Sequence, residues 1–329
     1  MSDLYDVAAI GNAIVDVITP SPEEFLADQG LVKGAMSLID EARAGELYEA
    51  MAQGVETSGG SAANTVAGLA SFGGRGAFIG KVADDQLGAV FGHDIRAIGA
   101  HFDTPPLKSG VSTARCLINV TPDGQRTMAT YLGAANLLGP GDVDPETIAA
   151  AKITFLEGYL FTPDEARKAF AKAAALARTN DRLISLTLSA GFVVENYREL
   201  LIDFIEQQVD ILFANDEEIT GLFQTKDFDE AVRLTRPHVK IAALTCGAEG
   251  SVVIGGGETH KITAEPIDKV VDTTGAGDAY AAGFLYGLAR GRSLDVCGRL
   301  ASIASAEVIS HYGARPVVSL KDLAIKAGL

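Results

Sequence analysis

Short apolar runs alternate with amphipathic stretches along most of the chain. The runs have the length of β-strands and lie at residues 7–10, 77–79, 153–156, 183–188, 211–214, 242–245 and 251–254. Helical patterns occur at residues 63–72, 86–98, 163–177, 195–206, 230–235 and 279–290. Continuous apolar strands that alternate with helices are typical of a parallel sheet covered on both faces. The pattern therefore predicts an α/β fold in which a doubly wound, mostly parallel sheet is flanked by helices.

One segment alternates with a period of two instead. Residues 113–121 place apolar side chains at 114, 116, 118 and 120, and a Pro122-Asp123-Gly124 turn leads into a second strand at 126–131. This is the pattern of a β-hairpin with one apolar face, which needs partner strands for stability. Residues 15–36 are the expected source of those strands. We therefore expect a small β-sheet lid, formed by residues 15–57 and 111–132, on a core formed by residues 1–14, 58–110 and 133–329.

The charge balance excludes some classes of partner. The 329 residues include 27 Lys and Arg against 43 Asp and Glu, a net charge of −16. Nucleic acids and anionic membranes are bound by net basic faces, so neither is expected as a partner, whereas a small anion in a local pocket remains compatible. The acidic start at residues 1–6 lacks the features of a signal peptide, and the three cysteines are scattered. A cytoplasmic protein is expected.

The most informative stretch is Asp272-Thr-Thr-Gly-Ala-Gly-Asp278, which precedes an apolar helix. Gly275 and Gly277 allow a tight turn whose N–H groups face one point, and the helix start adds its positive dipole end. Such a turn stabilises the negative charge of a phosphoryl group, and Asp278 is placed to take a proton from an alcohol. A plain helix N-cap after a glycine-rich turn is an equally good explanation of this spacing alone.

Two further motifs accompany this stretch. They are Ser58-Gly59-Gly60-Ser61-Ala62-Ala63-Asn64 and Asn215-Asp216-Glu217-Glu218. With residues 272–278, they resemble, in order and spacing, the motifs of the ribokinase-like (PfkB) carbohydrate and nucleoside kinase family, and the resemblance covers nearly the whole chain. Residues 188–192, Leu-Ser-Ala-Gly-Phe, are similar to a segment of the branch that phosphorylates adenosine, although Thr187 and Gly191 depart from its pattern. The resemblance implies a ribokinase-like fold and ATP-dependent phosphorylation of the 5′-hydroxyl of a purine nucleoside, adenosine to AMP.

The resemblance also assigns roles around the phosphates. Asp278 is the implied general base, and the amides of Gly275, Ala276 and Gly277 hold the transferring phosphoryl group. Asn215 and Glu218 are implied to position Mg²⁺ through water. By itself their motif is more typical of a capped, acidic helix start, and the glycine turn at residues 272–278 reverses that preference. K⁺ bound to backbone carbonyls around residues 272–274 is a further ion that the family implies.

For the nucleoside, the resemblance implies that Asp16 accepts hydrogen bonds from the two ribose hydroxyls. A carboxylate suits a vicinal diol because charge-assisted hydrogen bonds are strong. The other residues implied to line the sugar pocket are Asn12, Gly59, Gly60 and Asn64. Taken alone, these positions are also explained by a turn aspartate, a tight turn and an asparagine at a helix start.

The remaining roles concern the two bases and the lid. Tyr159 and Phe192 are implied to stack on the nucleoside base and Met36 to contact it from the lid, although such side chains are more often core residues. On the nucleotide side, Thr245 and Gly247 are implied to flank ATP. Arg126, just after the lid turn, is implied to move onto the phosphates when the lid closes; an exposed hairpin arginine is usually only solvated.

Two other functions remain open from the sequence. One is a kinase for a free sugar such as ribose or fructose, which would use the same phosphoryl-transfer residues. The other is a nucleoside-binding protein without catalysis, against which the intact residues Gly275, Gly277 and Asp278 argue. A monomer and a homodimer that pairs through the lid are both compatible with the sequence.

Overall fold

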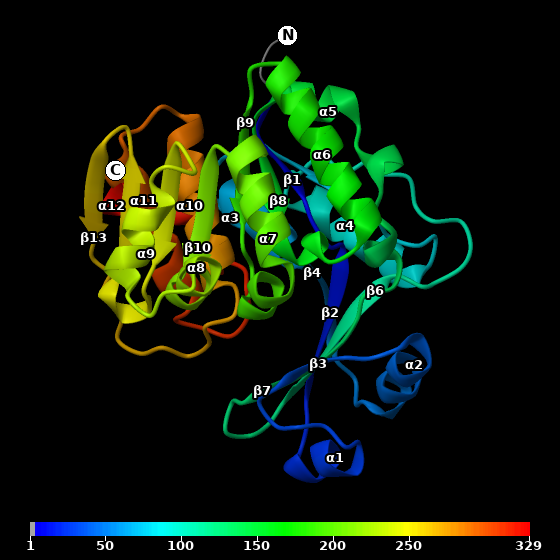
Figure 1. Cartoon of the computed structure of the whole chain (residues 1–329). Helices are drawn as coiled ribbons and strands as arrows, with labels where there is room; N and C mark the ends of the chain where they lie inside the picture. The colour runs from blue at the N-terminus through cyan, green and yellow to red at the C-terminus, as the bar shows by residue number, and fades with distance from the viewer. Residues whose placement is uncertain (1–3) are drawn as a thin grey trace.

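A computed structural model of the protein describes residues 4–329, and the first three residues of the acidic amino-terminal segment lie outside this range. Figure 1 shows a large sheet between layers of helices, with a smaller sheet that projects from its lower side. The two sheets contain eight and five strands. This arrangement confirms the predicted fold class.

The large sheet is parallel over most of its width. Its strand order is β13 (Glu258–Ile262), β12 (Ser251–Gly255), β11 (Ile241–Thr245), β10 (Ile211–Asn215), β9 (Leu183–Thr187), β8 (Ala151–Glu157), β1 (Tyr5–Ile10) and β5 (Gly76–Ile79). The strands from β5 to β11 are mutually parallel, whereas β12 and β13 are antiparallel to their neighbours. All seven predicted core strands are present, and β13 is an additional polar edge strand.

Helices cover both faces of this sheet. One face packs against α5 (Pro145–Ala150), α6 (Asp164–Thr179), α7 (Gly191–Gln208), α8 (Asp216–Phe223) and α9 (Phe228–Thr235). The other packs against α3 (Ser61–Ser71), α4 (Gln86–Ala97), α10 (Ala276–Ala289) and α11 (Leu294–Val308), and α12 (Leu320–Lys326) covers α3 and α11. In β1, Ala8 and Ile10 belong to the first core and Val7 and Ala9 to the second. This double burial explains why the strands read as continuous apolar runs.

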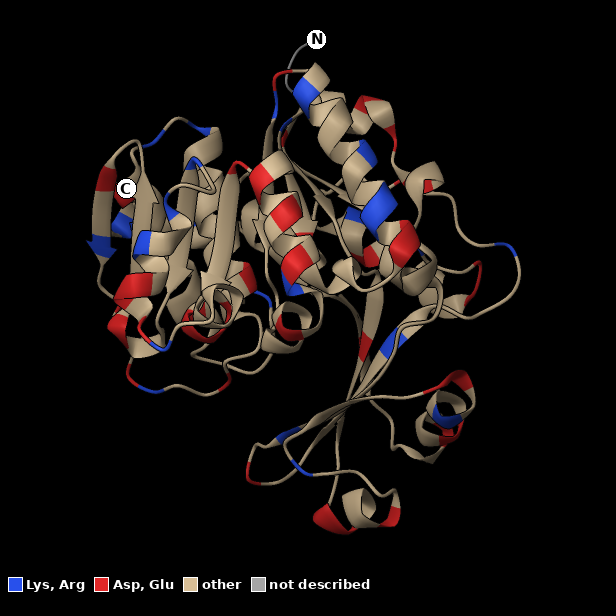
Figure 2. Ribbon diagram, viewed as in Figure 1, with Lys and Arg blue, Asp and Glu red and all other residues tan. Residues whose placement is uncertain are grey.

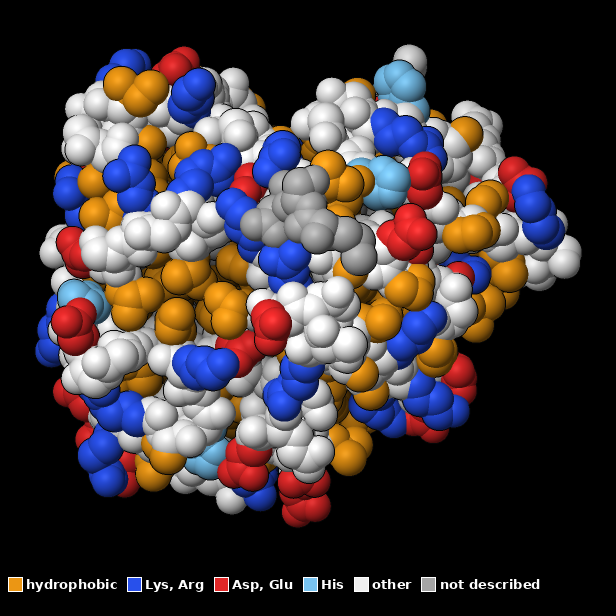
Figure 3. Space-filling view, turned by 90° about the horizontal axis from the view of Figure 1, so that it is seen from above, with side chains coloured by type: hydrophobic (Ala, Val, Ile, Leu, Met, Phe, Trp, Pro, Cys, Tyr) orange, Lys and Arg blue, Asp and Glu red, His pale blue; other side chains and the backbone are white. Residues whose placement is uncertain are grey.

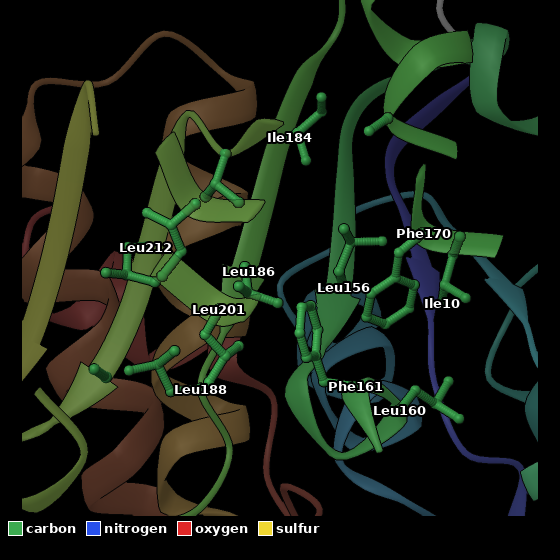
Figure 4. Packing of buried hydrophobic residues seen from close by; sticks show 14 of the residues in the cluster. Ile10, Leu156, Leu160, Phe161, Phe170, Ile184, Leu186, Leu188, Leu201 and Leu212 are labelled. Carbon is green, nitrogen blue, oxygen red and sulfur yellow. The ribbon is translucent and has the colours of Figure 1, made fainter. Parts of the chain in front are cut away.

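Alanine, leucine, isoleucine and valine side chains make up most of the first of these cores. Figure 4 shows Leu156 from β8 and Leu186 from β9 meeting Phe161 and Phe170. Burial on this scale contributes about 25 cal/mol for each Å² of apolar surface that is removed from water. The core therefore provides a rigid base for the strand ends, where polar side chains collect.

The small sheet combines two distant segments of the chain. Its order is β3 (Met36–Leu38), β7 (Arg126–Tyr131), β6 (Ala114–Val120), β2 (Ile14–Pro20) and β4 (Val55–Gly59). β6 and β7 form the predicted antiparallel hairpin. Helices α1 (Glu23–Asp28) and α2 (Glu41–Ala50) accompany the sheet, which lies away from the main body in Figure 1.

Charged residues are spread over both parts of the molecule. Figure 2 shows Asp and Glu on the core helices and also on α1 and α2, with Lys and Arg between them. The face opposite the small sheet, seen in Figure 3, also carries both signs side by side. Among residues 4–329, there is no helix with the length and apolar character needed to cross a membrane.

Candidate active site

A cavity of about 570 Å³ lies between the carboxyl ends of the large sheet and the small sheet. Strand ends from β1, β8, β9, β10 and β11 contribute to it, together with the start of α10 and one face of the small sheet. The predicted site residues that line it are Asn12, Asp16, Met36, Gly60, Asn64, Tyr159, Phe192, Asn215, Glu218, Thr245, Gly275, Ala276, Gly277 and Asp278. The carboxyl ends of parallel strands are where such folds bind ligands.

Asp278 is held by two side chains from another helix. Its Oδ1 accepts a hydrogen bond of 2.6 Å from Ser61 Oγ, and its Oδ2 accepts one of 3.1 Å from Asn64 Nδ2. Burial raises the pKa of this carboxyl group to about 6, although both hydrogen bonds act in the opposite direction. Helix α10 is capped by Gly275 and not by Asp278. The alternative explanation of Asp278 as a plain N-cap is therefore wrong.

The loop before α10 presents free N–H groups to the cavity. Within residues 4–329, the N–H groups of Gly275, Gly277 and Asp278 have no hydrogen-bond acceptor, whereas that of Ala276 donates to the Thr273 carbonyl at 3.2 Å. Ala276 was predicted as a further phosphoryl donor, but its N–H is already used. The available donors are consequently those of residues 275, 277 and 278, at the positive end of a helix.

Packing against the carboxyl-terminal segment shapes this loop. Gly275 has a φ of +79°, and a Cβ there would lie 2.6 Å from that of Ala314. Asp272 fixes the other side of the turn, because its Oδ1 accepts from Thr274 N at 3.0 Å and its Oδ2 from Gly313 N at 3.1 Å. Only glycine fits at position 275 without displacing this contact.

Asp16 faces the same cavity from strand β2. A Cβ on Gly59 would lie 2.3 Å from Asp16 Oδ2, and one on Gly60, whose φ is +92°, would lie 2.3 Å from the Asn12 carbonyl oxygen. The glycine pair thus lets the chain pass close to the carboxylate, although Gly59 itself does not line the cavity. Burial raises the pKa of Asp16 to about 6; Arg315 and Arg126 lower it, and Asp278 raises it.

A buried glutamate that the sequence analysis missed orders this end of the site. Glu157 Oε1 accepts a 2.6 Å hydrogen bond from Asn12 Nδ2, and Oε2 accepts from Ala62 N at 2.9 Å. Burial raises the pKa of Glu157 to about 7, against the effect of these hydrogen bonds. The only signal in the sequence is a carboxylate at the end of an apolar strand, which is rare unless the group is paired.

Asn215 and Glu218 form a reciprocal cap at the start of α8. Asn215 N donates to Glu218 Oε2 at 3.0 Å, and Glu218 N donates to Asn215 Oδ1 at 2.8 Å. Burial raises the pKa of Glu218 to about 7. The capped helix start considered for this motif is therefore present, and both residues also face the cavity.

The described residues form no cluster of three or more His, Cys, Asp or Glu side chains that could enclose a metal ion. Mg²⁺ commonly keeps several waters and is shared between one or two carboxylates and the phosphates of its substrate. The Asn215–Glu218 pair fits that mode, because its oxygens are engaged in the cap and can still accept hydrogen bonds from bound water.

The apolar part of the cavity lining comes from both the small sheet and the core. Met36, Leu38, Ile118 and Met128 of the small sheet face the cavity. Tyr159 and Phe192 belong to the core side, with ring centroids 6.0 Å apart. Cys116 also lines the cavity and accepts a hydrogen bond from Thr130 Oγ1 at 3.3 Å.

Besides Gly59, two predicted residues lie outside the cavity, Gly247 and Arg126. Gly247 follows β11 in a short turn, with open space around its α-carbon. Arg126 forms an ion pair with Asp272 at 3.1 Å, and the two side chains are only 9% and 8% exposed. The expectation of a merely solvated hairpin arginine is wrong, because Arg126 joins the small sheet to the loop that presents the free N–H groups.

Other polar groups near Asp278 were also missed. Ser61 lies within the glycine-pair motif at residues 58–64, and that motif could have identified it as a site residue. Arg315, whose Nε donates to Asn64 Oδ1 at 3.3 Å, comes from the segment after α11, and a single sequence contains no sign of that long-range contact.

Comparisons with known proteins agree with this geometry. Residues 7–320 match the model of the pfkB family carbohydrate kinases. The chain is 50% identical to an adenosine kinase of known structure from Sinorhizobium meliloti, with a TM-score of 0.90 over 98% of this chain and 99% of that one. A probable sugar kinase from Rhizobium etli CFN 42 gives 48% identity and a TM-score of 0.91 over 100% and 99%. Adenosine kinase of Saccharomyces cerevisiae is 28% identical, with coverage of 93% and 96%.

These relatives carry both nucleoside and sugar kinase names, so they establish the type of reaction and leave the phosphate acceptor open. A buried carboxylate beside free N–H groups at a helix start suits phosphoryl transfer to an alcohol. The chain is thus an ATP-dependent kinase that belongs to the pfkB family of carbohydrate kinases.

Proposed function

We propose that this kinase phosphorylates the 5′-hydroxyl of a purine nucleoside and converts adenosine and ATP into AMP and ADP. The observation that carries the proposal is the division of the cavity lining into a polar part and an apolar part. The polar part holds the carboxylates of Asp278 on the core side and Asp16 on β2 of the small sheet, with the free N–H groups. The apolar part holds Tyr159 and Phe192 of the core side and the methionine and leucine side chains of the small sheet. A nucleoside has the same division between a polar ribose and a flat, largely apolar base.

The proposed transfer step uses Asp278 as general base. A carboxylate oxygen takes the proton of the 5′-hydroxyl while the hydroxyl oxygen forms a bond to the γ-phosphorus of ATP. The bond from that phosphorus to the bridging oxygen breaks, and ADP leaves with its electron pair. The free N–H groups of Gly275 and Gly277 stabilise the charge on the phosphoryl oxygens. The hydrogen bonds from Ser61 and Asn64 keep Asp278 in position and favour its ionised form.

The other proposed roles are those that the resemblance implies, and they are compatible with the positions of the side chains in the cavity. Asp16 accepts hydrogen bonds from the ribose hydroxyls, and Tyr159 and Phe192 contact the base together with Met36. Asn215 and Glu218 hold Mg²⁺ through water, and the ion supplies neutralisation of phosphate charge. Thr245 lines the cavity next to the expected ATP position. Arg126 leaves Asp272 for the phosphates when residues 15–57 and 111–132 close as a lid.

A free sugar is the second candidate acceptor. It is favoured by the 48% identity to a protein named as a probable sugar kinase. The relative from Sinorhizobium meliloti, an adenosine kinase, favours adenosine at 50% identity. The apolar part of the lining supports the nucleoside, because a ribose or fructose alone would leave Met36, Leu38 and Met128 without a partner.

A substrate panel tests the proposal. ADP release is measured with adenosine, other nucleosides, ribose and fructose, each with the wild type and with Asp278→Asn as the blank. The expected result is that kcat/KM for adenosine exceeds that for ribose and fructose by at least about a hundredfold. A preference for a free sugar would replace this proposal with the sugar kinase, and tight adenosine binding without ADP release would indicate a non-catalytic binder.

The cytoplasmic location, the activation by K⁺ near residues 272–274 and the choice between monomer and homodimer stay predictions. Each has a direct measurement: cell fractionation, activity with K⁺ replaced by Na⁺, and mass determination in solution.

A further inference from the structure

Arg315 connects three parts of the molecule behind the cavity. It lies in the segment between α11 and α12, which is coloured red in Figure 1. Its neighbour Ala314 lines the cavity and packs on Gly275. Its Nε donates to Asn64 Oδ1 at 3.3 Å, whereas its Nη2 is buried with no hydrogen-bond partner among the described residues. A half-buried arginine with an unpartnered Nη2, so close to a reaction centre, invites a functional explanation.

The contact with Asn64 determines how that amide points. Asn64 Nδ2 donates to Asp278 Oδ2 at 3.1 Å, while Asn64 Oδ1 accepts from Arg315. An arginine side chain can only donate hydrogen bonds, so its partner on Asn64 must be the amide oxygen and not the amide nitrogen. A flipped amide would direct its oxygen at the carboxylate of Asp278. Arg315 thus keeps a hydrogen-bond donor on the carboxylate.

The charge of Arg315 also faces two carboxylates. It acts on Asp16 of strand β2 and on Asp94 of α4. Asp94 in turn accepts a 3.0 Å hydrogen bond from Ser58 N, which belongs to the strand paired with β2. The guanidinium therefore carries its positive charge near the carboxylates of Asp16 and Asp94.

We propose that Arg315 is a positioning residue of this site, which orients the Asn64 amide toward Asp278 and holds a positive charge near Asp16. It touches neither substrate and acts through these two residues. The inference rests on the proposed function in assigning Asp16 to ribose, whereas the hydrogen bond of Arg315 to Asn64 and its charge near Asp16 are properties of the chain alone. The size of the expected change in the pKa of Asp16 depends on the other charged groups near it.

Several other groups face these carboxylates. Asp16 faces Arg126 of β7 and Asp278 of α10, and the thiol of Cys116 on β6 lies beside it. Asp278 faces Glu157 and Tyr159 from the end of β8. Arg126 and Arg315 both lower the pKa of Asp16, so loss of Arg315 leaves a single cation nearby.

The first experiment follows the Asp16 carboxyl group by NMR in the ligand-free protein, with Asp16→Asn used for assignment. Arg315→Met removes the charge and keeps much of the side-chain volume. The expected result is a rise of about one unit in the pKa of Asp16 from its value of about 6. Arg315→Lys restores a charge and should bring the pKa most of the way back. An unchanged pKa in Arg315→Met would overturn the proposal.

The second experiment measures adenosine kinetics against pH. A rise from about 6 to about 7 would reduce the ionised fraction of Asp16 about threefold at pH 6.5 and hardly at all at pH 8. The ratio of the KM of Arg315→Met to that of the wild type should therefore be about three at pH 6.5 and close to one at pH 8. The kcat of the variant should fall at both pH values, because the Asn64 amide is no longer fixed. A KM ratio that is the same at both pH values would indicate a merely structural role.

Arg96→Gln is the matched control. Arg96 donates to the carbonyl oxygens of Gly92 and Phe102 near α4, without facing Asp16. Its loss should leave the KM ratio independent of pH. If Arg315→Met does not fold, Arg315→Gln takes its place in both experiments. The NMR titration needs no substrate, so the two experiments can fail separately. If the pKa of Asp16 rises in Arg315→Met but the wild type does not phosphorylate adenosine, the proposed function alone is refuted. If the wild type phosphorylates adenosine but the pKa of Asp16 does not change, this inference alone is refuted.

Discussion

The two walls of the cavity differ in how firmly their side chains are held. On the core wall, both oxygens of Asp278 are hydrogen bonded and the adjoining residues of α10 are buried. On the small-sheet wall, Met36 and Leu38 are 45% and 61% exposed, and all of β3 is exposed. Groups that carry out chemistry need a fixed geometry, whereas a wall with few buried contacts opens and closes at little cost. In the proposed function, this difference separates the reaction from the contact that Met36 makes with the base, whereas Tyr159 and Phe192 contact the base from the core side.

One ion pair crosses between these regions. Arg126 of β7 meets Asp272, which fixes the loop that holds the free N–H groups. The small sheet and that loop are therefore connected by a buried ion pair. The variants below test each wall separately, so that a change on one side can be compared with the other.

The largest effect is expected from Asp278→Asn on the core wall. The amide cannot accept the proton, so kcat for adenosine should fall about 10²- to 10⁴-fold while KM stays within about threefold. Steady-state kinetics with ADP detection measures both.

The same variant should be more stable than the wild type at pH 8. The folded-state pKa of Asp278 is about 6, above its ordinary value of 3.8, so this group lowers the stability of the fold progressively as the pH rises from about 4 to about 6, and the full loss is present above about 6. The gain in Tm should shrink toward pH 4. Asp229→Asn, at an exposed position of α9, is the control for this stability measurement. In the kinetic measurement, near-normal turnover of Asp278→Asn would contradict the role of Asp278 as the base.

A smaller loss is expected from Gly275→Ala, which changes the loop and leaves the base in place. The new Cβ would meet Ala314 at 2.6 Å in a backbone with φ of +79°, so the N–H groups should move and kcat should fall about tenfold to a hundredfold. Gly99→Ala is the matched control, because Gly99 also has positive φ, at +87°, but open space around it. It should lower Tm by a similar strain and leave kcat unchanged. Equal kinetics in the two variants would show that the loop does not hold the phosphoryl group.

Met36→Ser tests the other wall. Loss of the thioether side chain should raise KM for adenosine about fivefold to tenfold through lost apolar contact, with kcat and Tm almost unchanged because the residue is half exposed. Val55→Ser is the control: it is 67% exposed at the opposite edge of the small sheet and does not line the cavity. A fall in kcat without a change in KM would place Met36 in the chemistry and remove the proposed separation.

The smallest effect concerns pH. Asp278 accepts a proton only when it is ionised, so activity should decline as the pH falls through about 6. Ser61→Ala removes a hydrogen bond that favours the ionised form, and the decline should begin about half a unit to one unit higher. Ser71→Ala, at the far end of α3 and bonded to the α12 region, is the control. A profile of kcat that is the same in both variants would remove Ser61 from the titration of the base.

Much of the fold could be predicted because its strands are buried on both faces and contain almost only apolar residues. The strand β13 escaped notice because Glu258-Thr-His-Lys-Ile262 is a polar edge, exposed except at Ile262 and partly at His260. Helix α2 also escaped, since only Ala44 and Leu47 of it are buried. Elements that pack little leave little pattern in the sequence.

The candidate site divides in the same way. Asp278, Gly275 and Gly60 lie within short motifs whose chemistry is local, and the sequence was enough to find them. Glu157 and Arg315 act through residues that are 145 and 251 positions away, Asn12 and Asn64 respectively. Such contacts depend on the register of strands and on the path of the last loop, which no local pattern contains. The prediction that the N–H group of Ala276 is free was wrong for a related reason, since its hydrogen bond to the Thr273 carbonyl depends on the local geometry of the turn.

The contact between Gly275 and Ala314 has a consequence for biosynthesis. A nascent chain that ends before residue 309 already contains Asp278, both glycines and all eight strands of the large sheet. It lacks the backbone against which Gly275 rests and the amide of Gly313 that binds Asp272. The donor loop can therefore take its working shape only after the ribosome has added this last stretch, so a partly synthesised chain could hold the whole sheet and still spend no ATP.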